Sequence, residues 1–201
     1  MDEAAGEILA FWFGPAAGDA AVAKRQGKLW WSKNARLDAT IRDRFAATHQ
    51  RAARGEIDHW AGTPTGRLAL VIVLDQLSRV LYRGGADAFA QDERALALAL
   101  EAQERGEDRY LRLIERVFLY MPLEHSESLA LQQQCVRRFE ALLAELAPGE
   151  DRAPFKKLLG YARRHRDIIA RFGRFPHRNR ALGRKSTAAE LEFLRQRGSS
   201  F

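Results

Sequence analysis

Apolar residues recur at helical spacing along most of this 201-residue chain. In residues 38–54, for example, Ile41, Phe45 and Ala52 fall on one face of a helix, and Gly55 follows as a stop signal. No segment alternates apolar and polar residues with a period of two, so β-strands are not expected. The pattern predicts helices over residues 7–13, 20–31, 38–54, 66–82, 92–105, 109–120, 123–146, 155–172 and 187–198.

About nine helices joined by short connections predict an all-α protein built as an antiparallel helical array. Residues 66–82 are apolar nearly all round, which is typical of a central, buried helix. No Pro/Ser-rich linker or low-complexity segment divides the chain, so we expect residues 1–201 to form a single domain. A repeat of about 34 residues, which would indicate stacked helical hairpins, has no consensus match in the sequence.

Basic residues are concentrated near the C-terminus. The whole chain has 33 Lys and Arg against 26 Asp and Glu, but residues 152–201 alone contain 14 basic and 3 acidic residues. The rest of the chain is therefore mildly acidic. A basic segment on an acidic body is compatible with nucleic-acid binding, with binding of a small anion, or with an arm that pairs with the body's own carboxylates. We expect the C-terminal segment to fold back over the body.

Other features of the composition narrow the class of protein. Cys135 is the only cysteine, which excludes internal disulfides and thiolate zinc sites. The start of the chain, Met1-Asp2-Glu3, is unlike a secretory signal, and the longest apolar run, residues 68–74, is too short to span a bilayer. No P-loop, dinucleotide fingerprint, serine nucleophile elbow or metalloprotease motif is present. We therefore expect a cytoplasmic, soluble protein with no membrane association, no cofactor and no bound metal.

Charged residues occur on the helix that is expected to be most buried. Asp75 and Arg79 are four positions apart, and Arg83 continues their row. A lone buried charge costs several kcal/mol, so the pair must be mutually satisfied or open onto a polar cavity. One interpretation is a structural ion pair, and the other is that one member of the pair also faces a ligand.

Ionisable side chains gather at the start of the helix predicted over residues 123–146. Projecting its apolar stripe back from Gln132 places His125 on the inward face, with Glu124 and Glu127 on a flank. These groups can cap the helix and compensate its dipole, contact a ligand, or contribute to a metal site. His-x-Glu is too common a tripeptide to indicate a metal, and we expect none.

His165 interrupts the apolar stripe of the helix over residues 155–172, between Ala162 and Ile169. A single histidine on such a face is more often a hydrogen-bonded core residue than a catalyst. However, polar groups point inward from three separate helices, and buried polar groups tend to meet because none can be left unpaired. The groups expected to share one site are Asp75, Arg79, His125, Gln132 and His165.

The loop after residue 172 combines arginines with aromatic residues. Arg174, Arg178 and Arg184 can bind a phosphate or carboxylate bidentately, and Pro176 stiffens the loop between the first two. Phe175 lies among these arginines, which favours a packed loop over a solvated surface for nucleic acid. We therefore do not expect nucleic-acid binding. The same loop supplies two further polar residues, His177 and Asn179.

Five ordered motifs make the sequence resemble the bacterial domain of unknown function 924. They are residues 8–14 (ILAFWFG), the Trp30-Trp31 pair, residues 74–84 with LDQ, Arg79 and YRG, residues 121–127 (MPLEHSE), and residues 172–184 with FGRFPHRN and LGR. One departure is Ser78, where members of the family often carry proline. The resemblance covers nearly the whole chain and implies an all-helical fold similar to tetratricopeptide repeats. It implies no activity and no catalytic residues.

These features predict a polar pocket, lined by Arg and His beneath the loop of residues 174–184, that binds a small anionic ligand. The alternative is a protein- or RNA-binding scaffold with no small-molecule site. No nucleophile or leaving group can be named from the sequence, so enzymatic activity and a homo-oligomeric state are both left open. The candidate ligand-binding residues are Asp75, Arg79, Arg83, Glu124, His125, Glu127, Gln132, His165, Arg174, His177, Arg178, Asn179 and Arg184.

Overall fold

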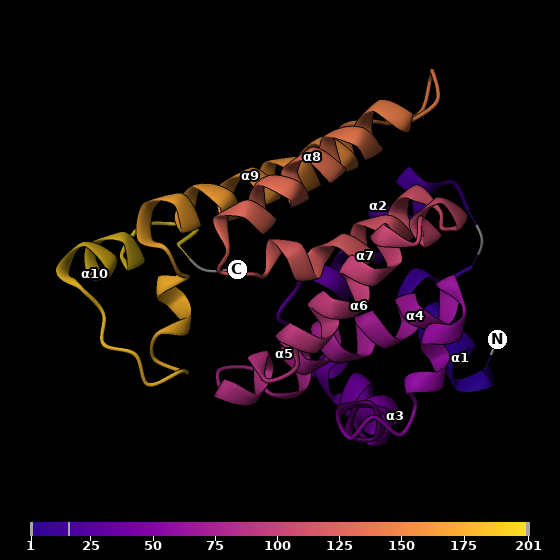
Figure 1. The fold of residues 1–201 in the computed structure, drawn as a ribbon, viewed down its shortest axis with the longest axis horizontal. Coiled ribbons are helices and arrows are strands. Elements are labelled where there is room, and N and C mark those ends of the chain that lie inside the picture. Colours follow the sequence, from indigo (N-terminus) through magenta and orange to yellow (C-terminus); the bar gives the residue numbers. More distant parts are fainter. Residues whose placement is uncertain (1, 16, 200–201) are drawn as a thin grey trace.

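Helices provide all the regular secondary structure of residues 2–15 and 17–199, the part of the chain described by this computed structural model (Figure 1). The all-α prediction is confirmed. None of the described helices is long and apolar enough to cross a membrane. The α-helices are α1 (Glu3–Phe13), α2 (Asp19–Trp31), α3 (Ala35–Ala53), α4 (Pro64–Val71), α5 (Ser78–Leu81), α6 (Asp92–Glu104), α7 (Leu113–Glu124), α8 (Leu129–Glu145), α9 (Ala153–Phe172) and α10 (Ala188–Leu194). Short 3₁₀-helices are η1 (Asp58–Gly62), η3 (Ala86–Phe89), η4 (Glu107–Tyr110) and η5 (Pro176–Arg178), and η2 (Ile72–Leu77) is a π-helical segment.

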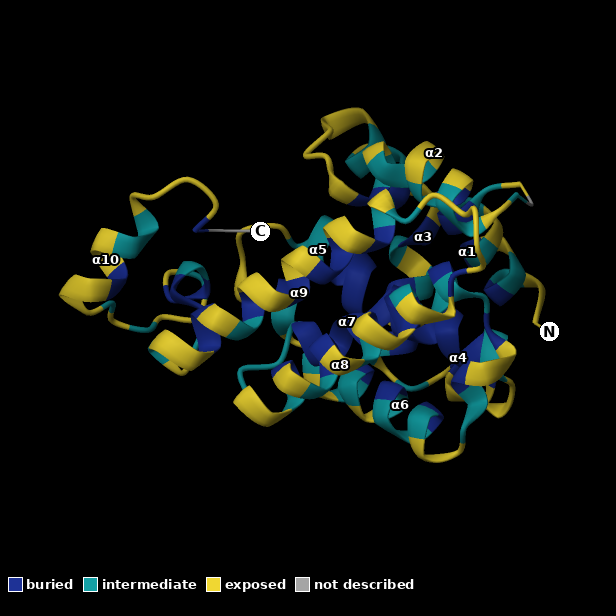
Figure 2. Ribbon diagram, turned by 90° about the horizontal axis from the view of Figure 1, so that it is seen from above, coloured by how far each residue is buried: buried dark blue, intermediate teal, exposed yellow. Residues whose placement is uncertain are grey.

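One continuous helix, formed by α4, η2 and α5, runs through the centre of the molecule, as residues 66–82 predicted. Every residue from 66 to 78 is buried, and α1, α3, α6 and α7 pack around this helix (Figure 2). A Cβ atom on Gly66 would lie 2.2 Å from the carbonyl oxygen of Trp60. Glycine is therefore needed where η1 approaches the helix backbone. Counted as one element, this helix brings the number in the described residues to the nine that the sequence predicted.

A hairpin of α8 and α9 covers α7 on one side of the molecule (Figure 1). Beyond α9 the chain doubles back, and residues 175–184 pack against the junction of α7 and α8 through the contacts described below. The end of α9 has a small apolar cluster of its own, in which Ile168, Ile169 and Phe175 pack with Phe172 and Phe193. Helix α10 projects from the body at the end remote from the N-terminus. A tetratricopeptide-like packing of the helices stays a prediction.

The predicted helix boundary at Pro122 is wrong. The helix expected over residues 109–120 runs instead from 113 to 124 and includes the proline. The next helix begins at residue 129, so residues 125–128 are not helical. Proline removes one backbone donor from the helix. Here the whole turn around Pro122 is buried, so packing against the core outweighs that loss. His125 consequently caps the C-terminus of α7 and does not lie on the inward stripe of α8.

Candidate functional site

A carboxylate and a histidine form a buried pair where η2 meets the end of α7. Asp75 is fully buried, and its Oδ1 lies 2.6 Å from Nδ1 of His125. Nη1 of Arg79 lies 3.2 Å from the same oxygen, and Gln76 donates to Oδ2 at 2.5 Å. Burial tends to raise the pKa of Asp75, but the charge of Arg79 and the hydrogen bond from His125 outweigh it and hold this pKa well below its usual range. Asp75 is therefore ionised, and the Nδ1–H of His125 donates to it.

Two arginines share a second carboxylate beside this pair. Arg79 donates to both oxygens of Asp92, at 3.0 and 3.1 Å. Arg178, on the C-terminal loop, donates to Oδ2 of Asp92 at 3.2 Å. Asp75, Arg79, Asp92 and Arg178 thus form one chain of contacts that links the central helix to the C-terminal segment.

A second histidine, His165, lies near His125 and also has a carboxylate beside its Nδ1. His165 Nδ1 lies 2.9 Å from Oε1 of Glu124 and 2.9 Å from the carbonyl oxygen of Tyr161. Its ring centre is 6.3 Å from that of His125, so the expectation that the two histidines lie together is confirmed. Gln132 donates to the carbonyl oxygens of residues 124 and 126. These two hydrogen bonds fix the turn between α7 and α8 that contains His125.

Glu127 fastens the C-terminal segment to the body. Both of its carboxylate oxygens accept from Arg184, at 2.6 and 2.9 Å, and its Oε1 also accepts from the backbone N–H of Phe175 at 2.8 Å. Arg184 in turn donates to the carbonyl oxygen of Phe175 at 3.2 Å. Burial tends to raise the pKa of Glu127, but these hydrogen bonds lower it overall. In this contact the basic C-terminal segment pairs with a carboxylate of the body. This is one of the three interpretations of the basic segment given in the sequence analysis.

Two of the predicted arginines lie outside the cluster. Arg83 follows the end of α5, so it leaves the row of Asp75 and pairs with Asp38 on the surface. Arg174 binds Glu190 through Nε and Nη2, at 2.6 and 2.8 Å, within the C-terminal segment itself.

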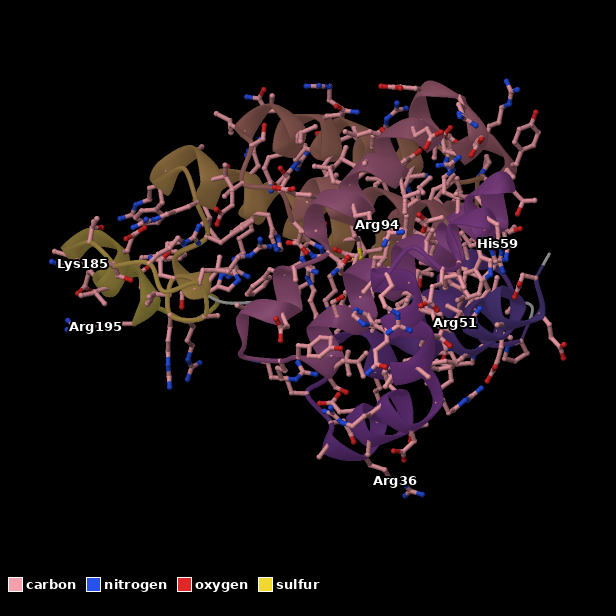
Figure 3. All side chains as sticks on the ribbon, turned by 60° about the horizontal axis from the view of Figure 1, so that its bottom comes forward. Arg36, Arg51, His59, Arg94, Lys185 and Arg195 are labelled. Atoms are coloured by element: carbon pink, nitrogen blue, oxygen red, sulfur yellow. The ribbon has the colours of Figure 1, made fainter. Side chains whose placement is uncertain are left out.

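The two remaining loop residues, His177 and Asn179, lie beside Phe175 and Ser186. His177 packs beside Phe175 with ring centres 5.6 Å apart, and burial together with the charge of Arg178 lowers its pKa to about 3. Asn179 is buried and donates to Ser186. Lys185 and Arg195, by contrast, lie on the outside of the segment (Figure 3).

Sequence reasoning missed Asp92, which was interpreted only as a helix start. Asp75, Glu124 and Glu127 were already expected in the same site as the arginines, so nothing in the sequence required a further carboxylate.

The predicted cavity stays a prediction. Two hollows of the described surface lie elsewhere, one against residues 18–24 and 150–151 and the other against residues 2–5 and 59–66. Among residues 2–15 and 17–199 there is also no group of three or more His, Cys, Asp and Glu side chains placed to hold a metal ion.

The fold and the cluster thus define an all-helical protein with a buried network of carboxylates, histidines and arginines at the junction of its body and its C-terminal segment. The chain belongs to the bacterial proteins of unknown function designated DUF924, whose family model matches residues 8–198. It is similar to a solved structure, the protein of unknown function ATU0120 from Agrobacterium tumefaciens. The two are 36% identical with a TM-score of 0.79, over 96% of this chain and 97% of that one. No curated protein matches the chain.

Proposed function

We propose that this protein binds a small anion through the guanidinium group of Arg178. The observation that carries the proposal is that Nε of Arg178 is buried and has no hydrogen-bond acceptor among the described residues. Buried N–H donors are nearly always paired, with protein, water or ligand. An unpaired donor on a buried cation is therefore a place where an anion fits.

The neighbours of Arg178 leave one edge of its guanidinium group for a ligand. The ring centres of Phe89 and Phe175 both lie 4.6 Å from its central carbon, and Asp92 accepts from Nη1. Nε and Nη2 remain, and they lie on the same edge of the planar group. Two parallel N–H groups on one edge match two oxygens of a carboxylate or a phosphate.

Local charge favours the same kind of ligand. Burial and the nearby charge of Arg79 lower the pKa of Arg178 to about 10, yet the group remains protonated at neutral pH. Arg79 and Arg178 share Asp92, so an additional anion would relieve their repulsion. Nε of Arg184 is a second buried donor with no acceptor among the described residues.

Replacing Arg178 with lysine is expected to weaken anion binding roughly tenfold, because lysine keeps the charge but loses the two-donor edge. Binding of acetate and of inorganic phosphate would be measured by titration calorimetry, with chloride used to hold the ionic strength constant. The matched control is Arg83→Lys, since Arg83 pairs with Asp38 on the surface, away from the cluster. Equal affinities in both variants and the unmodified protein, or no binding of either anion to the unmodified protein, would contradict the proposal.

A further inference from the structure

We propose that the ligand carries a hydroxyl group as well as its anionic group, and that it is a small hydroxycarboxylate. Its carboxylate would bind the open edge of Arg178, and its hydroxyl would donate to Nε2 of His125. This inference rests on the proposed function, because it assigns the second half of the same ligand.

The hydrogen bond to Asp75 determines what His125 can offer a ligand. Nδ1 lies 2.6 Å from the ionised carboxylate and must carry the proton of that bond. In the neutral ring Nε2 then has a lone pair and can only accept. Burial and the charge of Arg79 lower the pKa of His125, against the opposing effect of Asp75. The ring is therefore neutral at pH 7, and Nε2 is an acceptor there.

Nε2 of His125 is open to a ligand. All hydrogen bonds of His125 to the described side chains run through Nδ1, and 11% of its side chain is exposed. The site therefore combines donors on Arg178 with an acceptor on His125. A ligand that satisfies both must present acceptor oxygens at one end and a donor at the other, as a hydroxycarboxylate does.

Two chains of contacts place the two groups in one site. The ring of His125 lies 6.3 Å from that of His165, which lies 5.5 Å from Phe175, and the guanidinium of Arg178 lies 4.6 Å from Phe175. On the other side, Asp75 binds His125 and Arg79, and Arg79 reaches Arg178 through Asp92. Both groups therefore belong to the same cluster of contacts, and acids of different length test the span between them.

The first test compares pairs of acids that differ by one hydroxyl. Glycolate and acetate, and 3-hydroxybutyrate and butyrate, would be titrated calorimetrically into the unmodified protein at pH 7. At least one hydroxy acid is expected to bind about fivefold tighter than its partner, the effect of one well-placed hydrogen bond. Methoxyacetate keeps the oxygen of glycolate but has no O–H, and it should bind no tighter than acetate.

The second test removes the acceptor and keeps the partner of Asp75. In His125→Asn, the amide N–H₂ can donate to Asp75 in place of Nδ1–H, but no atom replaces Nε2. The variant should lose the preference for glycolate over acetate.

The outcomes separate the two proposals. Equal binding of every hydroxy acid and its partner, with a weakening by Arg178→Lys, overturns the hydroxycarboxylate and leaves anion binding standing. A preference that methoxyacetate shares, or that survives in His125→Asn, also overturns the role of His125. Failure of all five acids to bind would overturn the hydroxycarboxylate, and failure of inorganic phosphate to bind as well would overturn both proposals.

Discussion

Replacing Asp75 with alanine should lower the free energy of unfolding by about 3–5 kcal/mol, the usual effect of removing one member of a buried charge pair. Asp75 is fully buried and accepts from His125 and Gln76 while it pairs with Arg79. Without it, the N–H groups of His125 and Gln76 lose their acceptor inside the core. Arg79 would keep its ion pair with Asp92. However, Asp92 would then be the one carboxylate left to balance the charges of both Arg79 and Arg178 in this group of contacts.

Thermal unfolding followed by circular dichroism would measure this effect, and for a chain of this size the midpoint should fall by on the order of 10 °C. The matched control is Asp38→Ala, which breaks the surface pair with Arg83 and should cost less than about 1 kcal/mol. If Asp75→Ala and Asp38→Ala melted at the same temperature, the network around Asp75 would contribute far less to stability than its burial indicates.

Helical periodicity was sufficient to predict most of the fold. The central helix could be recognised because it is apolar on every side, and the stripe of α9 placed His165 correctly on the inward face. A helix end was predicted before Pro122 because proline usually ends a helix. The whole turn is instead buried by the surrounding helices, and this burial cannot be read from the local sequence. For the same reason the stripe of α8 was extended too far, and His125 lies at the end of α7 instead of on that stripe.

The meeting of polar groups was predictable from a physical rule rather than from any motif. Asp75, His125 and His165 come together because buried donors and acceptors must be paired. The partners of the arginines were not predictable, since spacing along the chain says nothing about which carboxylate a loop reaches. Arg174 illustrates the difficulty, because it pairs with Glu190 within its own segment.

This pairing changes what is expected of Arg174. The planar fork of Arg174 holds two oxygens of Glu190, and those hydrogen bonds lower the pKa of Glu190 to about 2. Arg174→Lys should therefore loosen the C-terminal segment. Acetate binding, measured beside Arg178→Lys, should be unaffected. A loss of acetate affinity in Arg174→Lys would instead return this arginine to the candidate site.

Replacing Glu127 with glutamine should release the C-terminal segment while leaving the body folded. Glu127 binds that segment through Arg184 and the backbone N–H of Phe175, beside the separate contact of Asp92 with Arg178. Glutamine has nearly the same shape, but it offers one acceptor oxygen and turns an N–H₂ group toward a guanidinium. The loss of charge-assisted hydrogen bonds worth about 1.5–3 kcal/mol should raise the open population of the segment roughly 10- to 100-fold.

Limited proteolysis with trypsin would measure that population, because residues 174–185 contain five Arg and Lys sites. When closing is faster than cleavage, the rate of cutting follows the open fraction, so the cleavage rate should rise by the same factor. Glu140→Gln is the matched control, since Glu140 pairs with Arg163 on the exposed outer side of the α8–α9 hairpin. Its cleavage rate should stay within about twofold of the unmodified protein, because exposed ion pairs contribute little. Faster cleavage in Glu127→Gln with an unchanged helical melting curve is the expected result. Equal rates in the two variants would mean that packing around Phe175, not the carboxylate of Glu127, holds the segment in place.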